Sequence, residues 1–141
     1  MEFSRTKEHW LFKFSPQEWI RAAMAELRRA EAAYARRSTR AGLAGARRAA
    51  GMALNAVLIV EPNDAWGRTY VEHLAGLKVA SDIPPAVRAA AALLVEAAPA
   101  GQALVVLRSK DQDQRVLEAA RDLTAHAYAV VARHEAGAQA G

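Results

Sequence analysis

The chain has 141 residues, of which 52% are hydrophobic and only 6% aromatic, and this alanine-rich composition fits one helical domain better than a sheet. The lack of cysteine excludes disulfides and thiolate metal sites. The sequence shows neither a signal peptide nor a run of ~20 apolar residues, so we expect a cytoplasmic protein that does not contact a membrane. The net charge of +4 is unevenly placed: residues 1–60 hold eleven Lys/Arg and five Asp/Glu, whereas residues 61–141 hold eight Lys/Arg and ten Asp/Glu. A basic half favours binding to RNA, DNA or an acidic partner protein, or is simply a solvated surface.

The first predicted elements are a short aromatic arm and a long helix. Residues 1–14 end in HWLFKF, and we expect these aromatic side chains to pack against the domain. The stretch Ser15-Pro16-Gln17-Glu18 has the form of a capping box with proline at the first helical position. It predicts a helix from Pro16 to about Arg37, whose apolar stripe would contain Ile20, Ala23, Leu27, Ala30 and Tyr34.

A second helix is predicted after the linker RRSTRAG and ends at Glu61-Pro62. It is apolar on nearly all sides, with a narrow polar strip that contains Arg48 and Asn55. Such a helix lies at the centre of a bundle or at a subunit contact. Glycines at positions 42, 45 and 51 would let another backbone approach it closely.

Two shorter helices follow in the prediction. Asn63 or Asp64 caps a short helix over AWGRTYVEHLAGL, and Ile83-Pro84-Pro85 opens a fourth helix. Pro99 and Gly101 then break the chain.

The last helix is predicted from about Asp113 to Glu135. The sequence therefore predicts an all-α fold, an up-and-down helical bundle of four main helices plus a short fifth. The arm would cover residues 1–14, the bundle residues 15–136, and a disordered tail residues 137–141.

The order of these features resembles a known family. Three stretches carry the likeness: RRAAGMALNAVLI, GRTYVEHLAGLKVASDIPPAVRAAAALL and LEAARDLTAHAYAVVAR. Together they cover roughly residues 16–135 and resemble the HEPN (higher eukaryotes and prokaryotes nucleotide-binding) family. The resemblance implies a small bacterial helical bundle, a homodimer that binds nucleotides or RNA and is encoded beside a nucleotidyltransferase partner. One departure is Tyr70, which follows Thr69 where the family often has histidine.

The last helix also resembles the signature of the RNA-cutting toxins in that family, an arginine followed after four to six residues by a histidine. The resemblance implies a metal-independent endoribonuclease of a toxin–antitoxin or defence system, with the catalytic residues Arg121, Asp122, His126 and Tyr128. Histidine titrates near neutrality and can take the proton of a ribose 2′-hydroxyl, while guanidinium stabilises the charged phosphorane. Asp122 and Tyr128 would orient them, and no cofactor is required.

Helical geometry separates these residues within one chain. Residues five positions apart lie about 140° apart around an ideal helix. Arg121 and Tyr128 therefore flank the apolar stripe on one side, and Asp122 and His126 on the other. A kink, or a second copy across a twofold axis, would be needed to join the arginine and the histidine. The alternative is that His126 is a histidine on a helix flank and Tyr128 a packing residue.

Other titratable residues carry weaker signals. The spacing of arginine and histidine recurs at Arg68 and His73, which makes either pair less informative. Glu26 and Glu31 point to different sides of their helix, and no Glu-x-x-His pair occurs, so we expect no metal site.

A cluster of arginines lies around the linker between the first two helices. Guanidinium groups suit phosphate, so the cluster is a candidate nucleic-acid-binding surface, or else a solvated helix edge. Its members are Arg36, Arg37, Arg40, Arg47 and Arg48. If neither candidate site is used, the chain is a non-catalytic helical adaptor whose apolar second helix binds itself or another protein.

Overall fold

The protein is all-α, as the sequence predicted. The computed structural model describes residues 9–97 and 106–140, with side chains at 10–97 and 112–138, and no strand occurs in these ranges. Within these ranges five α-helices pack against one another, while one 3-10 helix precedes α2 and a second lies between α3 and α4. The elements are η1 (His9–Lys13), α2 (Pro16–Ala35), α3 (Thr39–Val60), η2 (Asp64–Trp66), α4 (Tyr70–Lys78), α5 (Pro85–Glu96) and α6 (Val106–Ala140).

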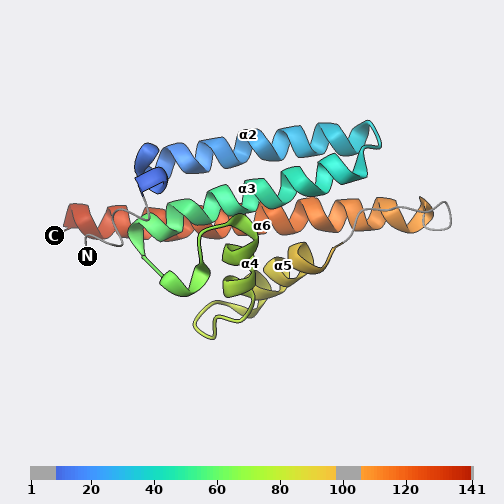
Figure 1. Ribbon diagram of the computed structural model, residues 1–141. Coiled ribbons are helices and arrows are strands. Elements are labelled where there is room, and N and C mark those ends of the chain that lie inside the picture. The colour runs from blue at the N-terminus through green and yellow to red at the C-terminus, as the bar shows by residue number, and fades with distance from the viewer. Residues whose placement is uncertain (1–8, 98–105, 141) are drawn as a thin grey trace.

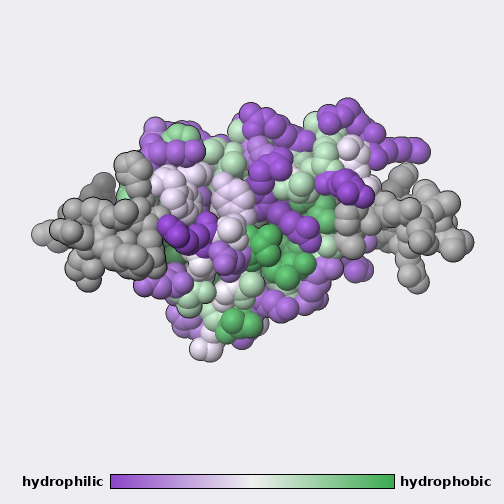
Figure 2. All heavy atoms as spheres, viewed as in Figure 1, coloured by the Kyte–Doolittle hydropathy of each residue, from purple (hydrophilic) through white to green (hydrophobic). Residues whose placement is uncertain are grey.

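The helix α3 lies at the centre of the bundle and contacts α2, α4, α5 and α6 (Figure 1). The helices α2 and α3 run antiparallel, the shorter α4 and α5 lie on one side, and α6 runs along the whole molecule in the direction of α3 (Figure 1). Hydrophilic side chains cover much of the outer edge along α2, and hydrophobic ones gather near α4 and α5 (Figure 2). This is the predicted bundle of four main helices plus a short fifth.

The start of α2 confirms the predicted capping box. The Ser15 hydroxyl accepts a hydrogen bond from the Glu18 backbone N–H at 3.2 Å, and Glu18 Oε1 accepts one from the Ser15 N–H at 2.8 Å. The Phe14 ring meets Trp19 edge-on at 4.9 Å between centroids, and Trp19 Nε1 donates to the Leu11 carbonyl at 2.7 Å. Residues 10–14 of the arm therefore pack on α2, although Phe12 is exposed; residues 1–8 lie outside the described ranges.

The beginning of α4 corrects the prediction. Asn63 caps only the single turn η2, through a hydrogen bond from the Ala65 N–H at 3.0 Å. Gly67 then adopts a φ of 70°, a left-handed conformation that ends the turn. The helix α4 starts at Tyr70, because the side chains of Thr69 and Glu72 form a second capping box.

The helix α6 is longer than predicted at both ends. It begins at Val106 and includes the polar stretch RSKDQDQ, and it continues to Ala140, so that residues 137–140 of the predicted disordered tail are helical. The reason is local: residues 106–136 contain no proline or glycine, and Arg, Lys and Gln are good helix formers even where they are solvated.

The apolar composition of α3 is explained by its burial. It is the one helix in the described ranges long and apolar enough to cross a membrane by composition, yet 67% of the relevant window is buried inside the bundle. Its glycines serve close packing, as predicted: a Cβ at Gly45 would lie 3.1 Å from Ala30 Cβ of α2, and one at Gly42 would lie 2.7 Å from the Tyr34 ring.

Candidate functional sites

Arg121 and Tyr128 of α6 both face α2. The Arg121 guanidinium forms an ion pair with Glu31, and both side chains are about 40% exposed. Tyr128 is 64% exposed and lines a groove between the two helices. Arg121 is therefore already paired within its own chain, although solvent still reaches it.

His126 lies on a different side of α6 and does not meet Arg121. It is half-buried, and burial together with the positive charge of Arg133 lowers its pKa, while Glu61 raises it. Its Nε2 is buried and has no hydrogen-bond partner in the described part of the chain. Since α6 has no kink (Figure 1), the separation of about 140° persists. One copy of the chain therefore brings Arg121 and Tyr128 to one side and leaves His126 on another; Asp122 is exposed.

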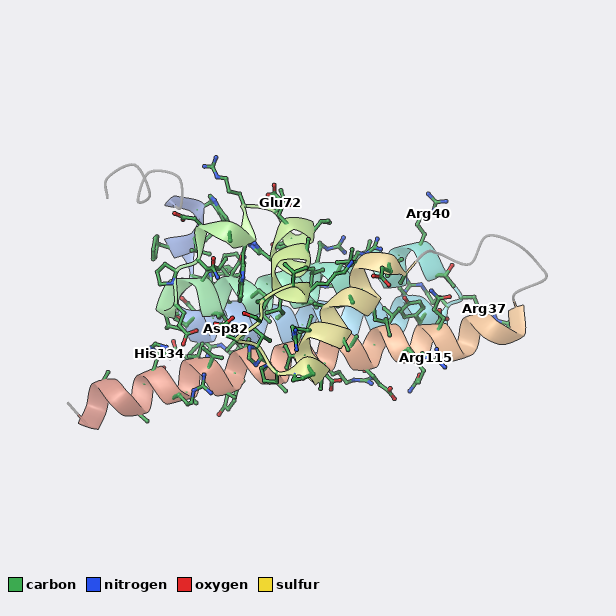
Figure 3. The ribbon with its side chains drawn as sticks, turned by 90° about the horizontal axis from the view of Figure 1, so that it is seen from below. Arg37, Arg40, Glu72, Asp82, Arg115 and His134 are labelled. Carbon is green, nitrogen blue, oxygen red and sulfur yellow. The ribbon has the colours of Figure 1, made fainter. Side chains whose placement is uncertain are left out.

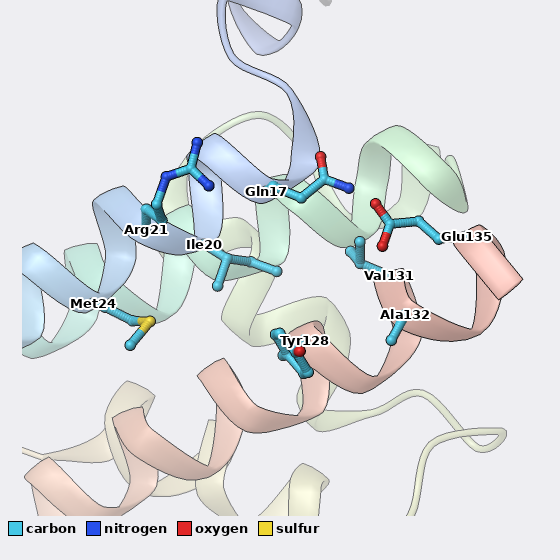
Figure 4. Close-up of a pocket in the computed structure, with 8 residues that line it drawn as sticks. All are labelled: Gln17, Ile20, Arg21, Met24, Tyr128, Val131, Ala132 and Glu135. Carbon is cyan, nitrogen blue, oxygen red and sulfur yellow. The ribbon is translucent and has the colours of Figure 1, made fainter.

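The α2–α6 groove has a volume of about 240 Å³ and a mostly apolar lining (Figure 4). Its walls include Met24, which is 46% exposed, and Tyr128. The other lining residues are Gln17, Ile20, Arg21, Val131, Ala132 and Glu135.

Two members of the predicted arginine cluster are occupied by protein acceptors. Arg47 donates hydrogen bonds to the carbonyl oxygens of Leu94, Val95 and Ala97 at 2.8, 3.3 and 2.7 Å, and so caps the C-terminus of α5. Arg48 binds the carboxylate of Glu26 at 2.6 Å. These two arginines hold α5 and α2 on α3. Their guanidinium groups therefore have partners within the protein and need no ligand to explain their presence.

The other three members, Arg36, Arg37 and Arg40, form the exposed α2–α3 arginines. They surround the turn between these helices, and none pairs with a carboxylate in the described ranges. Arg37 adopts a φ of 64° and ends α2. Arg37 and Arg40 lie toward the same end of the molecule as Arg115 of α6 (Figure 3).

The sequence did not identify a buried polar cluster beneath α4. His73 is fully buried; its Nδ1 lies 2.8 Å from the Trp66 carbonyl oxygen, and its Nε2 lies 3.0 Å from Asn55 Oδ1. Burial is the main reason that the pKa of His73 is lowered. The sequence placed Asn55 on the polar strip of its helix, but Asn55 is fully buried because α4 packs on that side of α3. The available signal for His73 was a polar residue beside Leu74 in α4.

The hydrogen bonds of His73 define its tautomer. A neutral ring that donates from Nδ1 to the Trp66 carbonyl can only accept at Nε2, so Asn55 must present its NH₂ group there. Rotation of the Asn55 amide by 180° exchanges Oδ1 for Nδ2, which otherwise has no partner in the described ranges. The cluster is thus a buried hydrogen-bonded contact that joins α3, η2 and α4.

Tyr70 and Glu26 extend this polar region toward α2. The Tyr70 ring packs on Gly51 and meets His73 edge-on at 6.4 Å; burial, and then the charge of Glu26, raise its pKa. Although burial alone would raise the pKa of Glu26, hydrogen bonds from Arg48 and Arg29 lower it. The His73 side chain at the centre of this region is closed to solvent.

The described residues contain no group of three or more His, Cys, Asp or Glu that is arranged to hold a metal ion. No family model, curated protein or solved structure matches the chain. The resemblance to the HEPN family therefore rests on the three sequence stretches quoted above.

Proposed function

We propose that this chain is a cytoplasmic helical module that binds phosphate-rich polyanions, RNA above all, through the α2–α3 arginines. The observation that carries the proposal is that Arg36, Arg37 and Arg40 are exposed and unpaired in the described part of the chain, whereas Arg47, Arg48 and Arg121 have protein partners. Guanidinium groups bind phosphate oxygens in a bidentate manner. The HEPN resemblance supports the same ligand class.

The salt dependence of RNA binding tests this proposal. Three phosphate contacts on a single strand predict a slope of about −2 for the logarithm of the association constant against the logarithm of salt concentration. The variant R36Q/R37Q/R40Q should lose most of this slope and of the affinity for a fluorescently labelled single-stranded RNA. The control R21Q/R28Q/R133Q removes the same charge from exposed arginines elsewhere and should lose much less. Equal losses in the two variants, or no binding by the wild type, would overturn the proposal.

A second candidate is the metal-independent endoribonuclease of a toxin–antitoxin or defence pair, with a nucleotidyltransferase as partner protein. It is favoured by the lowered pKa of His126, which keeps the imidazole neutral and able to act as a base at neutral pH. It requires a second copy of the chain to supply Arg121 across a contact. Mixed RNA incubated with a chelator should be cut by the wild type but not by His126→Ala; the same result with both proteins removes this candidate.

A further inference from the structure

One side of α6 carries an exposed row of residues with the 4-3-4-3 spacing of a helix contact. The row borders the α2–α6 groove, where Tyr128, Ala132 and Glu135 belong to the lining. Its members, all exposed, are Arg121, Ala125, Tyr128, Ala132 and Glu135. We call this set the α6 row.

The α6 row is symmetric in position and opposite in charge about Tyr128. Arg121 precedes Tyr128 by seven residues and Glu135 follows it by seven, so each charge lies about 10.5 Å from it along the axis. A second α6 packed antiparallel, with its Tyr128 on a common twofold axis, would place Arg121 of each copy opposite Glu135 of the other. The small residues Ala125 and Ala132 between them would let the helices approach closely. Such self-complementarity is what a twofold interface requires.

We propose that the α2–α6 groove and the α6 row are where a second copy of this chain docks, with α6 against α6 in antiparallel orientation. Tyr128 of each copy covers the apolar groove of the other, above Ile20 and Val131. This contact removes from water two of the large hydrophobic side chains that are exposed in the described ranges, Met24 and Tyr128.

The existing ion pair of Arg121 does not oppose this contact. Arg121 and Glu31 are both well exposed, and pairs of this kind contribute little to stability. Arg121 can therefore add Glu135 of the second copy as a partner.

The proposal is independent of polyanion binding, because the α2–α3 arginines lie outside the α6 row. It argues against the nuclease candidate, because His126 lies about 140° around α6 from the α6 row and does not enter this contact.

Charge reversal and sedimentation velocity test the arrangement. The single variants E135R and R121E each place like charges opposite one another, so each should raise the dimer dissociation constant about tenfold or more. An equimolar mixture of the two should form a heterodimer with an affinity near that of the wild type, because both pairs are then complementary. The double variant R121E/E135R should dimerise for the same reason. The exposed R133E lies off the row and should leave association unchanged.

Recovery in the mixture also shows that the single variants are folded, and circular dichroism of each variant checks this directly. A wild type that stays monomeric at tens of micromolar would leave the groove to a different partner and overturn the proposal. Dimers that survive both single reversals, or a mixture that fails to recover association, would place self-association on another face and overturn it equally.

Discussion

Replacing Gly51 by alanine should destabilise the protein, although alanine is the better helix former. A Cβ at position 51 would lie 2.5 Å from Tyr70 Cβ and closer still to its Cγ and Cδ1. These atoms form the base of the side chain, so no rotation of the ring tip relieves the overlap, and α4 must move relative to α3.

The size of the effect follows from two opposing contributions. Alanine gains up to about 1 kcal/mol of helix propensity over glycine. Overpacking of a well-packed site costs typically about 1–3 kcal/mol, and here the overlap involves a Cβ anchored to the backbone of a second helix. We therefore expect a net loss of about 1–2 kcal/mol in the free energy of unfolding, which lowers the melting midpoint of a chain of this size by about 3–6 °C.

Urea unfolding monitored by circular dichroism measures this difference, and α6 supplies a matched control. Gly137 also lies in a helix, but nothing lies within 4 Å of a Cβ built there, so Gly137→Ala should be neutral or slightly stabilising. In a Tyr70→Gly background, which removes Cβ as well as the ring, Gly51→Ala should change sign and stabilise. If Gly51→Ala stabilises the wild type, or destabilises the Tyr70→Gly variant equally, the close packing of α4 on α3 is not as described.

Two further predictions concern buried contacts. Because burial lowers the pKa of His73, the folded state binds fewer protons than the unfolded state; stability should be complete above about pH 6.5 and fall below it by up to about 1.4 kcal/mol per pH unit. Denaturant midpoints between pH 5 and 7 should show this slope. His73→Gln should reduce the slope to the part contributed by His126, whose pKa burial also lowers; an equal slope in both proteins contradicts the assignment. Arg47→Lys should lose about 1–3 kcal/mol in urea unfolding, because an ammonium group cannot bridge the carbonyl oxygens that end α5, whereas Arg40→Lys on the surface should change stability by less than about 0.5 kcal/mol. Equal effects of the two lysine substitutions would refute the capping role of Arg47.

The helices could largely be predicted from the sequence, because the capping and periodicity patterns that define them are local. The capping box at Ser15 and Glu18 involves residues three positions apart, and the apolar period of α3 involves residues within one or two turns. The start of α4 was predicted too early, even though its own capping box at Thr69 and Glu72 is equally local. There the positive φ of Gly67 separated two elements that the sequence pattern had joined.

The candidate sites were readable only in part. Helical geometry predicted that Arg121 and His126 lie on different sides of α6, and the structure agrees because α6 is straight. The five arginines of the predicted cluster look alike in the sequence, yet Arg47 caps α5 and Arg48 binds Glu26, while the α2–α3 arginines stay exposed.

By itself, the sequence determined an all-α bundle and the apolar stripes of its helices, since both depend on interactions within a few residues. Only the tertiary structure decided which polar groups are already satisfied. The partners of Arg121, Arg47 and His73 lie 90, 47–50 and 7–18 residues away along the chain. The packing of distant helices decides whether a charged side chain is paired and whether an imidazole is buried or exposed to solvent. A local sequence pattern does not contain this information.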